Sequence, residues 1–163
     1  MSIFQNYIDG QWVSSTTATK NINPSDTNDV VGEYACAEKD QVDAAIAAAV
    51  AASKSWGSGG VQQRFDCLDA IGTEILARKD ELGRLLAREE GKTLPEAIGE
   101  VGRAGQVFKF FAGESLRIQG DYGASVRPGV EIEVSREALG VIGVITLGAT
   151  LFMAGRLYKR FRG

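Results

Sequence analysis

The chain has 163 residues, of which 44% are hydrophobic and 24% charged, a balance typical of one folded globular domain rather than of a disordered segment. Its net charge of −3 argues against a nucleic-acid partner, which requires a basic surface. The absence of histidine excludes a Ser-His or Cys-His catalytic pair within the chain, and no cluster of cysteines and carboxylates predicts a metal site.

Short strands are expected in the first 35 residues. The segment YIDGQWV places Asp9 and Gly10, which tolerate the positive φ of a type I′ turn, between two β-prone runs. This pattern predicts a hairpin that pairs residues 7–8 with 11–13. Residues 14–29 are rich in turn formers, and residues 30–35 are expected to form a further strand.

Four helices follow, since apolar residues recur at three- and four-residue spacing. Asp40 is the expected cap of the first helix, and Gly91 is expected to end the third. The sequence EEGK at 89–92 is therefore interpreted as a helix end rather than as catalytic apparatus. Thr93 and Glu96 have the spacing of a capping box at the start of the fourth, where Gly102 and Gly105 predict close packing. The aromatic residues of this helix, Phe108, Phe110 and Phe111, are interpreted as core rather than as a stacking surface. The expected ranges are 40–56, 61–78, 80–90 and 93–116.

Extended structure is expected after Gly120. Apolar and polar residues alternate from 130 to 135, which predicts a half-exposed strand. Residues 138–146 have no polar side and predict a strand covered on both faces, with Gly140 and Gly143 permitting close packing.

The order and spacing of these features resemble the N-terminal part of the aldehyde dehydrogenase superfamily. The matching segments are YIDGQWV, INPSDTNDVVGEYACAEKDQVDAAIAAAVAASKSW, LLAREEGKTLPEAIGEVGRAGQVFKFFAGESLR and REALGVIGVIT, which together span about residues 5 to 146. Within the superfamily, the pattern is most similar to semialdehyde dehydrogenases that act on small carboxylated aldehydes.

The resemblance implies an α/β fold. It would be the helix-rich N-terminal part of a Rossmann-like NAD-binding domain, with part of an oligomerisation hairpin. The implied reaction is oxidation of an aldehyde to its acid with NAD or NADP. Ile145 and Thr146 match positions that line the family's cofactor cleft. Family members are usually dimers or tetramers, so self-association is expected.

The resemblance ends at Thr146, which divides the chain into 1–146 and a divergent tail at 147–163. Where the family continues with Pro-Trp-Asn-Phe-Pro, this chain reads Leu-Gly-Ala-Thr-Leu-Phe. We therefore expect no catalytic residue, a truncated and inactive chain, and no cofactor binding by the chain alone. Cys36 and Cys67 are interpreted as incidental rather than nucleophilic. These two distant cysteines and the lack of a secretory signal favour the cytoplasm.

Two other functions stay open. The chain could be a non-catalytic interaction module that pairs with itself or with a full-length dehydrogenase. It could also associate with a membrane through residues 138–162, because residues 138–155 carry no charge and a basic cluster follows; we expect this less. Helical spacing in the tail predicts a basic amphipathic helix that covers a sheet edge, binds a partner or contacts an anionic membrane.

Overall fold

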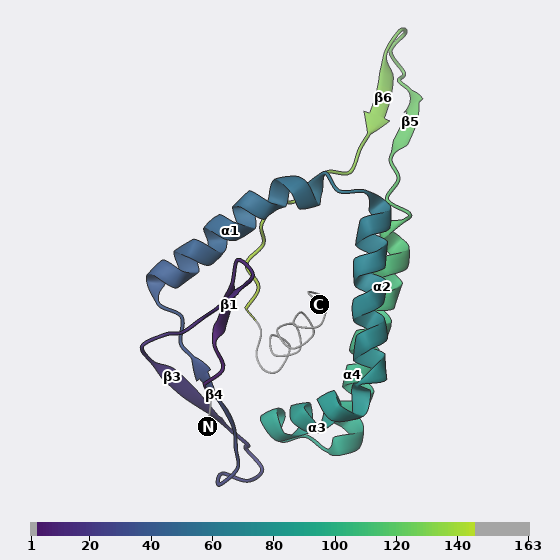
Figure 1. Cartoon of the computed structure of the whole chain (residues 1–163). Coiled ribbons are helices and arrows are strands. Elements are labelled where there is room, and N and C mark those ends of the chain that lie inside the picture. The colour runs from purple at the N-terminus through teal and green to yellow at the C-terminus, as the bar shows by residue number, and fades with distance from the viewer. Residues whose placement is uncertain (1–2, 146–163) are drawn as a thin grey trace.

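The computed structural model describes residues 3–145 and has a helix-rich α/β architecture (Figure 1). In these residues, three two-stranded antiparallel sheets accompany four helices. The strands are β1 (Asn6–Ile8), β2 (Gln11–Val13), β3 (Ala18–Ile22), β4 (Val30–Ala35), β5 (Asp121–Ala124) and β6 (Glu131–Val134). The helices are α1 (Lys39–Gly57), α2 (Val61–Ala77), α3 (Lys79–Glu90) and α4 (Leu94–Ser115).

The predicted β1–β2 hairpin is confirmed. Ile8 pairs with Gln11 across the turn, and Asp9 and Gly10 have φ values of 47° and 78°. Both angles lie in the left-handed region, as a two-residue turn of this type requires.

Strand β3 was not predicted, because Thr and Asn in its sequence resemble the turn formers on either side. It pairs with β4 from Ala18↔Ala35 to Ile22↔Val30, with an irregular register between Asn21 and Ile22. Strand β3 therefore depends on hydrogen bonds to the backbone of β4, and its own residues do not reveal that pairing.

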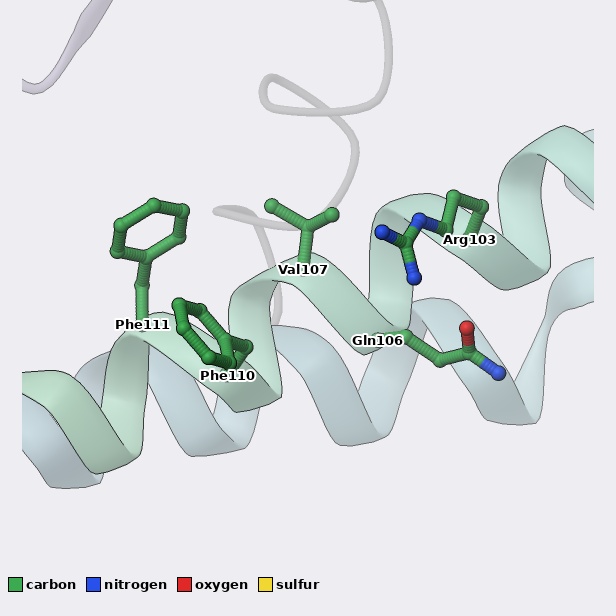
Figure 2. Close-up of a pocket in the computed structure, with 5 residues that line it drawn as sticks. All are labelled: Arg103, Gln106, Val107, Phe110 and Phe111. Atoms are coloured by element: carbon green, nitrogen blue, oxygen red, sulfur yellow. The ribbon is translucent and has the colours of Figure 1, made fainter.

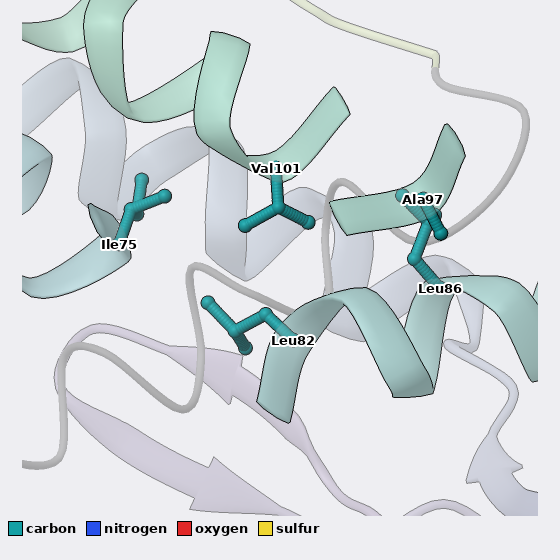
Figure 3. Packing of buried hydrophobic residues seen from close by; sticks show 5 residues of the cluster. All are labelled: Ile75, Leu82, Leu86, Ala97 and Val101. Carbon is teal, nitrogen blue, oxygen red and sulfur yellow. The ribbon is translucent and has the colours of Figure 1, made fainter. Parts of the chain in front are cut away.

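The core lies among α2, α3 and α4. Figure 3 shows its buried cluster, formed by Ile75, Leu82, Leu86, Ala97 and Val101. Gly72 and Leu76 on α2 contact Gly105 on α4, and Lys109 Nζ donates to Asp69 Oδ1 at 2.7 Å. Asp69 on α2 contacts Lys109 on α4, whereas Leu76, which comes later in α2, contacts Gly105, which comes earlier in α4. The two helices therefore run antiparallel.

The helix ends confirm two of the three predicted signals. Thr93 and Glu96 form the capping box of α4, and Gly91, with φ of 70°, ends α3. Asp40 was the wrong cap for α1, which begins after Glu38 and has a capping box between Glu38 and Gln41. Glu38 also accepts a hydrogen bond from Thr16 Oγ1, so a contact distant in sequence helps to set this boundary.

Helix α1 has an apolar stripe, yet none of its residues is buried. Val42, Ile46 and Val50 are 46–53% exposed. The spacing therefore identified an apolar side correctly, but no described element covers it. Periodicity shows which side of a helix is apolar and not what packs against it.

The expected strand at 138–146 is wrong over the residues that the structure describes. Residues 138–145 have no strand geometry, and Leu139 is 90% exposed. A Cβ added at Gly140 or Gly143 would meet no atom of residues 3–145 within 4 Å, so neither glycine packs closely against this part of the chain. A strand needs a hydrogen-bonded neighbour, and none of the described strands pairs with this segment.

Polar contacts fasten the β3–β4 hairpin to the end of α3. Arg88 Nε and Nη2 donate to the two carboxylate oxygens of Asp29 at 2.9 and 2.6 Å. Asn21 Nδ2 donates to Glu89 Oε1 at 2.9 Å, and Ser25 Oγ donates to the Gly91 carbonyl at 3.1 Å. Hydrogen bonds from Arg88 and then Asn23 lower the pKa of Asp29 to about 2.

Replacing Arg88 by alanine is expected to raise the pKa of Asp29 from about 2 toward its ordinary value of 3.8. Since the native pKa is lowered, the ionised pair stabilises the fold fully above pH 3.8, and this stabilisation is lost as the pH falls toward 2. NMR titration of the Asp29 carboxyl carbon measures the shift. Arg84→Ala, at an exposed position of the same helix, is the control; an equal shift there would contradict the assignment.

Candidate functional site

Of the two positions predicted to contact a cofactor, the structure describes only Ile145. Ile145 is 98% exposed, and Thr146 lies outside the described residues. The glycine turn of a dinucleotide site connects a strand directly to a helix. Gly140, with φ of 91°, does not lie in such a connection within residues 3–145. Within residues 3–145, Ile145 and Gly140 are therefore not part of a strand–turn–helix dinucleotide site.

The two cysteines lie on separate elements. Cys36 follows β4, is half-buried, and has its Sγ 3.0 Å from Thr19 Oγ1, a hydroxyl rather than a base or a cation. Cys67 is exposed on α2. Among residues 3–145, no group of three or more His, Cys, Asp and Glu side chains could hold a metal ion.

The polar end of α3 is structural. Asn21 holds the partly buried Glu89, and burial raises the pKa of this carboxyl while the Asn21 hydrogen bond lowers it. Lys92 Nζ lies 2.5 Å from carboxylate oxygens of both Glu90 and Glu100, and these hydrogen bonds raise the pKa of Lys92. The sequence EEGK was interpreted as a helix end rather than as catalytic apparatus, and the left-handed conformation of Gly91 confirms that helix end.

A hollow on α4 is a further candidate site among the described residues. Figure 2 shows its lining, which is Arg103, Gln106, Val107, Phe110 and Phe111, and its volume is about 280 Å³. The two phenylalanine rings meet edge to face, with centroids 5.3 Å apart and an interplanar angle of 87°. Phe110 is 60% exposed and Phe111 is 54% exposed.

We call this surface the α4 outer face: the five lining residues together with Glu100 and Glu114, one helical repeat beyond them at either end. It lies away from the core because Val101, Gly105 and Ala112 occupy the opposite side of the helix. Phe111 was expected to be buried, and its exposure corrects that prediction. Since three large apolar side chains lie together at the surface, the α4 outer face is suited to apolar contact with another segment.

The β5–β6 hairpin extends beyond the end of α4 (Figure 1). Strand β6 was expected at 130–135 and is present, whereas its partner β5 was not predicted. Ile132 and Val134 lie on the same face of β6 and are each about half exposed, so the described residues leave this apolar face of the hairpin uncovered. In residues 3–145, none of the helices has both the length and the apolar content needed to cross a membrane.

Comparison with known proteins gives a family match over most of the chain. The Aldehyde dehydrogenase family matches residues 12–147. An alpha-ketoglutarate semialdehyde dehydrogenase of Haloferax volcanii is 36% identical over 144 residues, covering 87% of this chain and 30% of that protein. A malonate-semialdehyde dehydrogenase of Lacticaseibacillus casei is 34% identical, covering 87% of this chain and 29% of that protein.

Solved structures agree. A betaine aldehyde dehydrogenase of Staphylococcus aureus, crystallised with NAD⁺, superposes with a TM-score of 0.76 and 30% identity over 82% of this chain and 27% of its own. An NAD-dependent aldehyde dehydrogenase of Sinorhizobium meliloti has a TM-score of 0.72 and 27% identity over 77% of this chain. The chain thus spans about 30% of the length of the curated relatives that it matches.

Proposed function

Because the chain belongs to the aldehyde dehydrogenase family, we propose that it is the N-terminal part of an enzyme that oxidises an aldehyde to its carboxylic acid with NAD or NADP. The helix-rich α/β fold is that of the N-terminal part of the family's NAD-binding domain. We further propose a semialdehyde as the substrate class. The observation that carries this proposal is the 34–36% identity to semialdehyde dehydrogenases over nearly nine tenths of the chain.

We propose that residues 1–146 support the fold and the cofactor site of such an enzyme and take no part in the chemical reaction. Helices α2, α3 and α4 form a packed scaffold around the buried cluster. Ile145 and Thr146 would supply apolar or backbone contact on the adenosine side of the cofactor. Ile145 is almost fully exposed, which supports the idea that further polypeptide is needed to build a cofactor site around it.

The 163-residue polypeptide alone is expected to be inactive, because the resemblance places the family's catalytic cysteine and general-base glutamate after the matching segment, and neither Cys36 nor Cys67 matches the catalytic position. The test incubates the purified chain with succinate semialdehyde and either NAD⁺ or NADP⁺ and follows absorbance at 340 nm. A full-length semialdehyde dehydrogenase is the positive control. No aldehyde-dependent signal above the protein-free reaction is expected. Turnover that Cys36→Ser or Cys67→Ser abolishes would contradict this proposal.

A non-catalytic interaction module is the second candidate. The apolar stripe of α1 and the uncovered β5–β6 hairpin favour it, since surfaces of this kind mark contacts between proteins. The partner would be a second copy of this chain or a full-length dehydrogenase. Size-exclusion chromatography of the same preparation, with and without the full-length enzyme, separates the two candidates. Co-elution supports pairing, and separate elution argues against it.

We propose the cytoplasm as the compartment. Cys36 and Cys67 are both free thiols, which supports a reducing environment.

A further inference from the structure

We propose that the first part of the chain moves as one body about the connection between α1 and α2, and that a polar latch at the end of α3 holds it closed. The moving body is the strand unit, residues 3–57, and its counterpart is the helical unit, residues 61–116. The proposal does not depend on the aldehyde dehydrogenase activity. The closing contact, here called the α3 latch, consists of Asn21, Ser25 and Asp29 on one side and Arg88, Glu89 and Gly91 on the other.

The strand unit is held together by contacts of its own. The ring of Phe4 stacks on that of Tyr34 with centroids 5.1 Å apart, which fixes the start of the chain to β4. Helix α1 is joined to the strands by Gln41, whose side-chain oxygen accepts hydrogen bonds from Asn6 Nδ2 at 3.2 Å and Ser15 Oγ at 2.7 Å. These contacts connect the strands and α1, so we treat them as one body.

No buried apolar cluster joins this body to the helical unit in the described part of the chain. The buried apolar side chains of residues 3–145 all belong to α2, α3 and α4, whereas α1 has no buried residue. Figure 1 shows α1 and strands β1 to β4 on one side and α2 with α4 on the other. Parts of a chain that share no large apolar interface are expected to move relative to each other.

The described contacts between the two units are polar and concentrate at two places. At the connection, Arg64 Nη2 donates to the carbonyl oxygens of Trp56 and Gly57 at 3.2 and 2.8 Å, which holds the end of α1 beside the start of α2. At the other place, the α3 latch supplies the Arg88–Asp29 ion pair and the hydrogen bonds beside it. Movement of the strand unit therefore requires bending at the connection and release of the α3 latch.

The connection has the composition of a hinge. Residues 58–60 are Ser, Gly and Gly, and glycine has the widest choice of backbone angles. A Cβ on Gly60 would meet no described atom within 4 Å, so no described side chain packs against this position. Hinges are a few residues at the ends of elements that absorb a change in φ and ψ.

The α3 latch fixes an orientation without burying its charges. The Arg88 guanidinium donates to both carboxylate oxygens of Asp29, and such a bidentate pair sets the relative direction of the two side chains. The Arg88 side chain is 45% exposed and that of Asp29 is 29% exposed, so water and salt reach the pair. Loss of this pair should therefore change the position of the strand unit rather than unfold either unit.

Double electron–electron resonance between two spin labels tests the proposal in the full chain. One label is placed on Cys67 of α2 and the other on Ala44→Cys of α1, with Cys36→Ser, because positions 44 and 67 are both exposed. We expect one narrow distance distribution in this labelled chain, and a second population in Arg88→Ala with the open-to-closed ratio raised roughly tenfold. Arg84→Ala, one turn earlier on α3, is the matched control and should keep the single distribution.

Three further measurements separate hinge motion from unfolding. Adding Gly60→Pro to Arg88→Ala should narrow the distribution again, because Gly60 has φ of −64°, which proline adopts. Circular dichroism at 222 nm should give equal helix content with and without Arg88→Ala, since the buried cluster is untouched. Raising sodium chloride from about 0.05 M to about 1 M should enlarge the second population without any change at Arg88, because salt screens an exposed pair.

Four outcomes would overturn the proposal. One is a distance distribution in Arg88→Ala that matches Arg84→Ala, and another is a second population that appears only together with loss of helix. A third is a second population that Gly60→Pro leaves unchanged, which would place the motion outside the connection. The fourth is a distribution that does not respond to salt when Arg88 is present; this measurement stands even if Arg88→Ala fails to fold.

Discussion

Replacing Val101 by aspartate is expected to abolish cooperative unfolding of the helical region. Val101 is fully buried at the contact among α2, α3 and α4 (Figure 3). A carboxylate there loses its hydration without gaining a partner, which costs at least about 4 kcal/mol against a typical domain stability of about 5–15 kcal/mol. Urea denaturation followed by circular dichroism at 222 nm measures the loss.

Val107→Asp is the matched control for this experiment, since it makes the same change six residues further along the same helix. Val107 lies on the outer face and is 38% exposed. We expect its free energy of unfolding to change by less than about 1 kcal/mol. Equal losses in the two variants would mean that the assignment of buried and exposed sides of α4 is wrong.

Two glycine-to-alanine changes are expected to shift stability in opposite directions. A Cβ on Gly83 would lie 2.6 Å from Ile98 Cγ1 and 2.9 Å from Ile98 Cα, so α3 and α4 would have to separate. Such overpacking costs about 1–3 kcal/mol. A Cβ on Gly102 would meet nothing within 4 Å, and alanine there gains about 1 kcal/mol in helix propensity.

Thermal unfolding of both variants beside the unmodified chain measures these effects. Gly83→Ala should lower the melting temperature, and Gly102→Ala should raise it. A rise for both would show that the close approach of α3 to Ile98 is absent in solution.

The helices and the first hairpin could be predicted because their signals are local. The Asp9-Gly10 turn, the Thr93 capping box and the Gly91 terminus each depend on residues within one turn, and the structure confirms all three. Strand β3 and the start of α1 depend on contacts with residues far away in sequence. Such contacts can override local propensity, which is why these two features were missed or misplaced.

Burial was harder to predict than secondary structure. Gly102 and Gly105 looked alike in sequence, but only Gly105 packs against α2. Val42 and Ile46 share the spacing of a buried helix face and are nevertheless about half exposed. Periodicity identifies an apolar side, whereas burial also requires a second surface that covers it.

The candidate site was predicted only in part. Ile145 was identified through a family resemblance, and in the described structure its side chain is 98% exposed. The α4 outer face was not predicted, because Phe108, Phe110 and Phe111 were all interpreted as core. A helical projection centred on Val101 would have shown that Val107 and Phe110 point away from the buried side.

The claim on which this account depends is that residues 1–163 contain no nucleophile for aldehyde oxidation. Trapping tests it most directly: the chain is incubated with a labelled semialdehyde and NAD⁺, and the intact protein is then analysed by mass spectrometry. The account predicts an unchanged mass and unlabelled peptides at Cys36 and Cys67. A stoichiometric thioester on either sulfur would contradict it.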